Sequence, residues 1–147
     1  MNIKNNSFVG IDLSYTSPAF TVYNETSNQY FIYYLTKIKK CQRVFTKDNF
    51  TFIGKPSFEG TLNGSVRYKA IADWIYETLR DNHPEAKLVL IEGYSMNSRG
   101  SRTFEIGENA GMCKYVLMDN DYEITLMSPR EIKKFACGNG GVGKYSM

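Results

Sequence analysis

A carboxylate interrupts the first apolar segment of this 147-residue chain. Residues 8–13 and 19–23 are two apolar runs, and the turn of Ser, Thr and Pro residues between them predicts a strand hairpin. Asp12 lies inside the first run. A buried carboxylate costs roughly several kcal/mol unless it is paired, hydrogen-bonded or bound to a cation. Asp12 is therefore the first candidate for a functional residue.

Length and cysteine usage favour one domain, residues 1–147, in a reducing compartment. Cys41, Cys113 and Cys137 have no spacing that indicates a zinc site or a disulfide framework. The polar N-terminus does not resemble a signal peptide, and no run approaches the roughly 20 apolar residues of a membrane span. We therefore expect a cytoplasmic protein, nucleoid-associated if it is cellular. The net charge of +3 permits a polyanion partner.

The order of the expected elements predicts an α/β fold. After the hairpin, the aromatic and β-branched residues 29–36 predict a third antiparallel strand, and apolar periodicity predicts a helix over 64–82. Further elements follow: a strand over 87–92, a helix over 103–118, a strand over 122–127 and a capped helix over 128–137. This order predicts a mixed five-stranded sheet, three antiparallel strands and then two parallel ones, with helices on both faces.

Residues 37–63 are less regular and are interpreted as a basic, strand-rich insertion. Its Lys and Arg residues alternate with Phe45, Phe50 and Phe52. Such a mixture can hold a nucleic-acid backbone and stack on bases, which makes Lys39 and Lys40 candidate DNA contacts. A solvated edge over a small apolar cluster explains the same pattern.

A second carboxylate, Glu92, ends the apolar run of residues 87–92. If its strand neighbours that of Asp12, at about 4.8 Å, both side chains can face one ion. Two carboxylates with water and a substrate phosphate are a usual Mg²⁺ site, in which Mn²⁺ can substitute. Paired ions of this kind activate water for phosphodiester cleavage. The alternative is that each acid only caps a strand end.

Four segments, in this order, resemble the RuvC-type Holliday junction resolvases of the RNase H-like superfamily. They are Val9-Gly-Ile-Asp-Leu-Ser14, then Leu90-Ile-Glu92 with the helix segment at 104–111, then Ser128-Pro-Arg-Glu-Ile-Lys133, then the glycine-rich residues 138–144. The resemblance implies an RNase H-like fold and Mg²⁺-dependent nicking of four-way or branched DNA junctions. It implies that Asp12 and Glu92 are metal ligands and that Lys133 and Lys144 lie near the scissile phosphate.

The resemblance also implies a homodimer and a set of DNA contacts. The helix that carries Gly107 and Gly111 has the position of the family's dimer-forming helix. The loop with Tyr94 and Met96 has the position of an apolar wedge at the junction centre. Candidate phosphate contacts are Arg99, Arg102 and Arg130.

One departure from the family concerns the metal ligands. The family completes its site with acidic residues on a helix beyond the glycine-rich segment, whereas this sequence stops at Met147. We therefore expect the C-terminal catalytic helix to be missing and this chain to bind Mg²⁺ weakly and cleave slowly. The alternative is a non-catalytic RNase H-like module that binds DNA junctions or a protein.

Two other classes fit the sequence less well. Residues 138–144 match the phosphate-loop pattern, but Tyr145 replaces the Ser or Thr that would bind Mg²⁺, and a helix precedes the loop. An actin-like kinase shares the opening hairpin but needs a second, similar domain, for which the length is insufficient.

Overall fold

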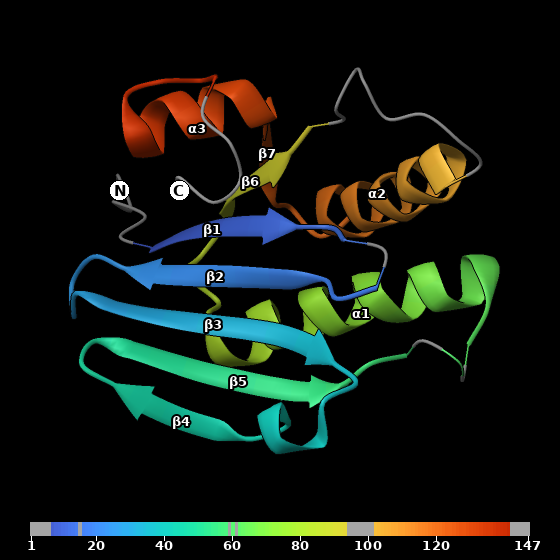
Figure 1. Ribbon diagram of the computed structural model, residues 1–147, viewed down its shortest axis with the longest axis horizontal. Coiled ribbons are helices and arrows are strands. Elements are labelled where there is room, and N and C mark those ends of the chain that lie inside the picture. The colour runs from blue at the N-terminus through green and yellow to red at the C-terminus, as the bar shows by residue number, and fades with distance from the viewer. Residues whose placement is uncertain (1–6, 15, 59, 61, 94–101, 142–147) are drawn as a thin grey trace.

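The structure, a computed structural model, describes residues 7–14, 16–58, 60, 62–93 and 102–141 (Figure 1). Seven strands form one sheet in the order β4-β5-β3-β2-β1-β6-β7. Their bounds are β1 Ser7–Asp12, β2 Ala19–Asn24, β3 Gln29–Thr36, β4 Val44–Lys47, β5 Phe50–Pro56, β6 Leu88–Glu92 and β7 Glu123–Met127. The sheet is mixed, because β1 pairs antiparallel with β2 but parallel with β6.

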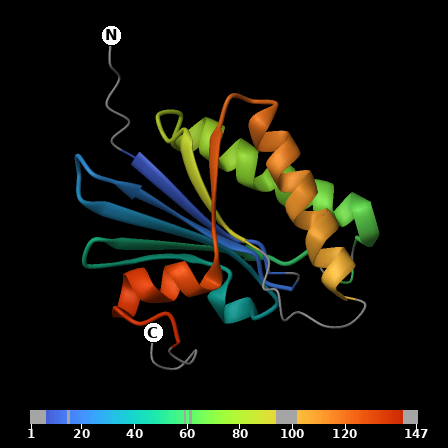
Figure 2. The ribbon, with the colours of Figure 1, turned by 90° about the horizontal axis from the view of Figure 1, so that it is seen from above.

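Helices lie on both faces of this sheet. The helices α1 (Gly64–Asn82) and α2 (Arg102–Met118) cover one face, and α3 (Pro129–Cys137) lies on the other, as the view from above shows (Figure 2). A 3₁₀ helix, η1 (Lys39–Cys41), joins β3 to β4. This arrangement confirms the predicted α/β fold, a mixed sheet with helices on both faces. Within the described part of the chain, no helix combines the length and apolar character that crossing a bilayer requires.

The sheet has two strands more than the five expected. Both lie in the segment 37–63: β4 pairs antiparallel with β5, and β5 adds to β3 in parallel. The remaining order, β3-β2-β1-β6-β7, is the predicted arrangement of three antiparallel and two parallel strands. The sequence predicts a strand-rich segment here but not its place in the main sheet, because β4 is exposed throughout and lacks the alternating apolar pattern of a half-buried strand.

The main core lies between the sheet and the pair α1 and α2. Alternate residues of each strand point to this side, so Val9 and Ile11 of β1 are buried together with Ile75 and Leu79 of α1. Regularly spaced apolar residues after Gly64, and Pro84 just beyond the end, explain why α1 has the bounds that its sequence predicts. The core therefore holds β1 and β6 firmly from one side.

The opposite face of the sheet is only partly covered. Phe8 of β1 is 46% exposed and Leu90 of β6 is half-buried, although the apolar run of β6 predicts burial on both faces. The helix α3 buries none of its residues, and its Phe135 is 90% exposed. The helix therefore stands away from the sheet, and a space remains between them.

Candidate active site

The two predicted acids lie side by side on adjacent parallel strands. Ile11 of β1 is in register with Ile91 of β6, so that Asp12 and Glu92 follow at the same level, each as the last residue of its strand. Both are exposed, and both point to the face that carries α3. The structure therefore brings Asp12 and Glu92 together, as their strand positions predict.

The exposure of Asp12 differs from the expectation of a carboxylate inside a buried strand. Val9 and Ile11 face the core, whereas Gly10 and Asp12 face the thinly covered side. Solvent therefore reaches the carboxylate of Asp12, and no buried charge has to be compensated in the free protein.

An open pocket of about 500 Å³ contains both acids. Its floor is the sheet surface of β1, β2 and β6, and its roof is the apolar side of α3. The lining residues are Gly10, Ile11, Asp12, Ala19, Phe20, Thr21, Leu90, Glu92, Met127, Ile132, Phe135 and Ala136. Apart from Thr21, the two carboxylates are the only polar side chains in this lining. The pocket thus concentrates negative charge at one end of an apolar groove.

The roof of the pocket starts at a well-capped helix end. The hydroxyl of Ser128 accepts a hydrogen bond from the backbone N–H of Glu131, and the carboxylate of Glu131 accepts one from the backbone N–H of Ser128 at 2.8 Å. The carboxylate of Glu131 also accepts a hydrogen bond from the Ser128 hydroxyl at 2.6 Å, and this bond, together with the one from the backbone N–H, holds the pKa of the Glu131 carboxyl below its ordinary value. Pro129 is the first residue of α3, where its fixed backbone favours a helix start. Gly138 ends the helix in the left-handed conformation. The capping box was predicted from the sequence and is confirmed.

The pair of acids fits a magnesium ion. Mg²⁺ is usually held by one or two carboxylates, with water and substrate phosphate as the other ligands. Asp12 and Glu92 supply two such ligands at the mouth of a pocket that is wide enough for a phosphate group. Within the described residues, no group of three or more His, Cys, Asp or Glu side chains is arranged to hold a metal ion.

The other predicted catalytic and DNA-contact residues that the structure describes lie on α3, α2 and η1. Lys133 and Arg130 lie on α3, Arg130 exposed and Lys133 half-buried, and neither belongs to the pocket lining. Arg102 is the first residue of α2. The predictions for Tyr94, Met96, Arg99 and Lys144 lie outside the described residues.

The predicted contacts Lys39 and Lys40 are exposed on η1, at the β4 side of the sheet. Three strands, β5, β3 and β2, separate β4 from β1. The two lysines are therefore remote from Asp12. A DNA strand that contacts both the lysines and the acids has to cross the sheet.

Sequence reasoning missed the roof of the pocket. Ile132, Phe135 and Ala136 line it from α3, and Met127 lines it from the end of β7. The three-residue spacing of Ile132 and Phe135 marks one apolar side of a short helix, and this signal was available in the sequence. It gives no indication of which sheet face the helix covers.

Comparisons with known proteins identify the fold. No protein-family model and no curated protein sequence matches the chain. RuvC of Thermus thermophilus is structurally similar, with a TM-score of 0.60 and 13% identity over 95% of this chain and 74% of that one. The same protein in complex with a Holliday junction substrate gives a TM-score of 0.60 and 11% identity, over 91% and 73%. The yeast mitochondrial Holliday junction resolvase Ydc2 gives 0.49 and 15%, over 89% and 54%. The chain thus has the RNase H-like fold that is found in RuvC.

Proposed function

We propose that the chain is a metal-dependent endonuclease that cuts branched DNA, with the four-way junction as its principal substrate. The observation that carries the proposal is the adjacent placement of Asp12 and Glu92 in one open pocket. The similarity to RuvC, one structure of which contains a Holliday junction substrate, supports the choice of DNA. The resemblance of four sequence segments supports the same choice.

In this proposal Asp12 and Glu92 hold Mg²⁺, with Mn²⁺ as a possible substitute. When bound, the ion supplies charge stabilisation to the phosphodiester and lowers the pKa of a water nucleophile. The two carboxylates hold that charge at the mouth of an open pocket, where both water and a phosphodiester can reach it. We assign Lys133 and Lys144 to the neighbourhood of the scissile phosphate, as the resemblance implies.

We propose that the DNA contacts surround this pocket. Arg130 is exposed on α3 and Arg102 begins α2, on the two helices that follow β7 and β6. Arg99, Tyr94 and Met96 belong to the loop between β6 and α2. In this assignment the arginines contact phosphates, and Tyr94 and Met96 act as an apolar wedge at the junction centre.

Junction nicking by Asp12→Asn and Glu92→Gln variants tests the proposal. A labelled four-way junction is incubated with the chain in Mg²⁺ and in Mn²⁺, and a linear duplex of the same sequence serves as the substrate control. The matched protein controls are Asp119→Asn and Glu77→Gln, because both acids are exposed and neither lines the pocket. We expect each site variant to lose at least about a hundred-fold in rate, the scale of one lost charge-stabilising group. Equal nicking by wild type and both site variants would refute the proposal.

We propose further that the active form is a homodimer joined through α2. Phe104, Tyr115 and Met118 are 78%, 67% and 64% exposed, and they lie on one side of α2 together with Glu108 and Gly111. A Cβ added at Gly107 or Gly111 would meet no heavy atom within 4 Å. This side therefore lets another helix approach closely, and large apolar side chains gathered on one exposed side usually mark an interface.

The oligomeric state of a Tyr115→Arg variant tests the dimer. Sedimentation equilibrium is expected to give a dimer for the wild type and a monomer for this variant, because a charge in the centre of an apolar interface is expensive to bury. Val44→Arg is the matched control, since Val44 is 65% exposed on the remote strand β4. A monomeric wild type would exclude this part of the proposal.

A second candidate function is a non-catalytic module that binds DNA junctions or a protein. The specific observation in its favour is that only two carboxylates meet at the site among the described residues, without a third metal ligand. Tight junction binding that is unaffected by Mg²⁺, with no detectable nicking in Mn²⁺, would favour this function over the nuclease.

A further inference from the structure

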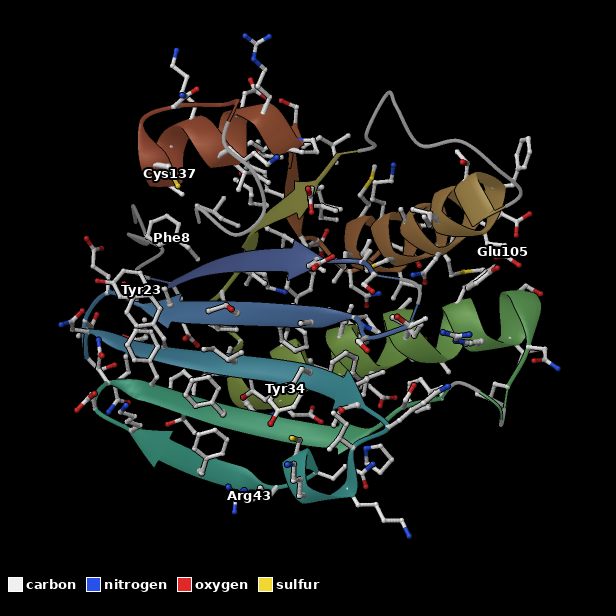
Figure 3. The ribbon with its side chains drawn as sticks, viewed as in Figure 1. Phe8, Tyr23, Tyr34, Arg43, Glu105 and Cys137 are labelled. Atoms are coloured by element: carbon white, nitrogen blue, oxygen red, sulfur yellow. The ribbon has the colours of Figure 1, made fainter. Side chains whose placement is uncertain are left out.

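A row of aromatic side chains crosses the thinly covered face of the sheet. Figure 3 shows Tyr23 on this face, and its register partner Tyr30 stands beside it. Tyr30 is in register with Phe50 of β5, and Phe45 of β4 with Phe52 of β5. The row thus runs Tyr23, Tyr30, Phe50, Phe52, Phe45 across β2, β3, β5 and β4, and two of these strands belong to the segment 37–63.

The rings contact one another continuously. Tyr23 stacks on Tyr30 with the centroids 4.6 Å apart, and Tyr30 stacks on Phe50 at 4.9 Å. Phe52 stacks on Phe45 at 4.6 Å, with Phe50 and Phe52 linking the two groups at 6.4 Å. Near-parallel rings at these distances are offset, so each leaves part of its surface open. Phe50 and Phe45 are 38% and 39% exposed. The rings are ordered in advance, so that a ligand would not have to order them.

Cations surround the β4 end of this row. The guanidinium of Arg43 lies 5.4 Å from the ring centroid of Phe45, and Lys47 shares the face of Phe45, two residues along β4. Residues 37–56 contain six Lys or Arg residues and one acid, Asp48. Lys39, Lys40, Arg43 and Lys47 are all exposed. The row therefore combines ring surfaces with a local excess of positive charge, which suits a polyanion and is unfavourable for a purely apolar partner.

We infer that this row, with Arg43 and Lys47, binds single-stranded DNA. Its three interstrand steps span about 14 Å, which is room for a few stacked nucleotides. Bases stack on sheet-face aromatics in this way in RNA-recognition sheets, and aromatic rings accept any base sequence. The inference rests on the proposed function in one respect, that the strand is an unpaired part of a branched substrate.

The row and the acids share one face of the sheet. Asp12 is in register with Ala19 of β2, and Ala19 and Tyr23 both point to that face because four residues separate them on one strand. Tyr23 is in register with Phe8, four positions before Asp12 on β1, so a DNA strand that leaves the pocket runs along β1 toward Phe8 before it meets Tyr23 and Tyr30. The extra strands β4 and β5 extend the sheet in the direction that such a strand takes.

Fluorescence anisotropy with an oligothymidylate of about 15 nucleotides tests the inference, with a duplex of equal length as comparison. Phe45→Ala and Phe50→Ala remove exposed rings. Val44→Ala is the matched control, since Val44 is exposed on the same strand as Phe45 but on its other face. We expect each ring variant to weaken binding at least about five-fold, the smaller value for one lost base stack. The dissociation constant for Val44→Ala is expected to equal that of the wild type.

The cations are tested through the salt dependence of the same binding. Lys47→Ala is expected to lower the slope of the logarithm of affinity against the logarithm of salt concentration by about 0.7, the value for one phosphate contact to a single strand. Lys69→Ala is the control, because Lys69 pairs with Asp73 on α1, which covers the opposite face. Circular dichroism of each variant verifies that it is folded.

The outcomes separate this inference from the proposed function. Oligothymidylate binding that is no tighter than duplex binding, or an equal loss in Val44→Ala and Phe45→Ala, would overturn the inference even if junctions are nicked. Self-association of the chain that Phe50→Ala abolishes, without DNA binding, would also overturn it and assign the row to a protein contact. Ring-dependent binding by a chain that nicks no junction would leave the inference standing and refute the nuclease.

Discussion

The hydroxyl of Tyr33 and Nε2 of His83 lie 2.8 Å apart in the interior of the protein, although fifty residues separate them in the chain. His83 follows the last residue of α1, and Tyr33 is on β3. Both side chains are buried, and the ring of Phe31 lies against the imidazole at 4.9 Å. This contact ties the C-terminus of α1 to the sheet.

Protonation of His83 is expected to destabilise the fold. Burial lowers the pKa of its imidazole below 6.5, and the negative charge of Glu85 opposes this only in part. The unfolded chain therefore binds more protons than the native protein. As a result, the contribution of His83 to the free energy of unfolding is complete above about pH 6.5 and is lost as the pH falls through the lower native pKa. Urea unfolding followed by fluorescence of Trp74, the single tryptophan, between about pH 5 and pH 7 measures this. His83→Gln is expected to flatten the dependence, and an unchanged slope would contradict the assignment.

The partner of His83 gives a separate prediction. Tyr33→Phe removes the hydroxyl but keeps the ring, which stacks on Phe20 at 4.7 Å. We expect a loss of about 1 kcal/mol in the free energy of unfolding, the usual net value of one hydrogen bond. Tyr23→Phe is the control, because the Tyr23 hydroxyl makes only an exposed contact to Asn28 at 3.3 Å. Equal losses of unfolding free energy in the two variants would show that the buried hydrogen bond contributes no more to stability than the exposed one.

Gly54 is expected to tolerate no side chain. A Cβ at this position of β5 would overlap the carbonyl oxygen of Cys41 and lie 2.9 Å from the ring of Tyr34. The same Tyr34 donates its hydroxyl to the Cys41 carbonyl at 2.9 Å, so this ring holds η1 over the strand. Gly54→Ala should lower the free energy of unfolding by about 3 kcal/mol, the upper part of the range for overpacking.

Gly10→Ala is the matched control for Gly54→Ala. Gly10 lies on the same face of the sheet, in β1, and a Cβ there would meet no heavy atom within 4 Å. We expect the Gly10→Ala variant to unfold within about 1 kcal/mol of the wild type. A larger loss in Gly10→Ala than in Gly54→Ala would mean that β1 and α3 are closer than the structure places them.

Manganese binding tests the two acids without any DNA. Electron paramagnetic resonance counts free Mn²⁺, and we expect Asp12→Asn or Glu92→Gln to raise the Mn²⁺ dissociation constant about ten-fold, because the affinity of an oxygen-ligand site follows its charge. Asp119→Asn controls for the general loss of one negative charge. Because no third metal ligand joins the pair among the described residues, wild-type binding is expected to be weak. Equal binding by all variants would place the ion elsewhere.

The three cysteines are expected to react with a thiol reagent at different rates. Cys137, at the end of α3, is exposed (Figure 3), Cys41 is half-buried and Cys113 is buried. Burial raises the pKa of the Cys113 thiol to about 12, which removes nearly all reactive thiolate at neutral pH. Cys137→Ser should eliminate the fastest phase of modification. A fast phase of unchanged amplitude in this variant would contradict the exposure of Cys137.

The central strands and the position of each acid at a strand end were predictable because both follow from local pattern. Apolar runs that end in Asp12 and Glu92 predict strands, and parallel neighbours place their carboxyl ends at one edge. The bounds of β3 and α1 agree with the prediction to the residue. These are the segments whose periodicity and flanking turns are strongest.

The remaining features depend on contacts between distant residues. The helix predicted over 64–82 ends just before His83, but the contact of His83 with Tyr33 exists only after β3 packs beside α1. The aromatic row is likewise invisible along the chain, because Tyr30 and Phe50 become neighbours through the parallel pairing of β3 with β5. The exposure of Asp12 was not predictable from the sequence, because it depends on how little of the sheet α3 covers.

The position of β4 and β5 at the margin of the sheet has an evolutionary consequence. Among the described strands they pair with the rest of the sheet through β3, whereas β7 lies at the other end of the strand order. In evolution, the length and the charge of β4 and β5 can therefore change while the central strands and the opposite edge keep their structure. New ligand preferences can arise there without a matching change at the acids.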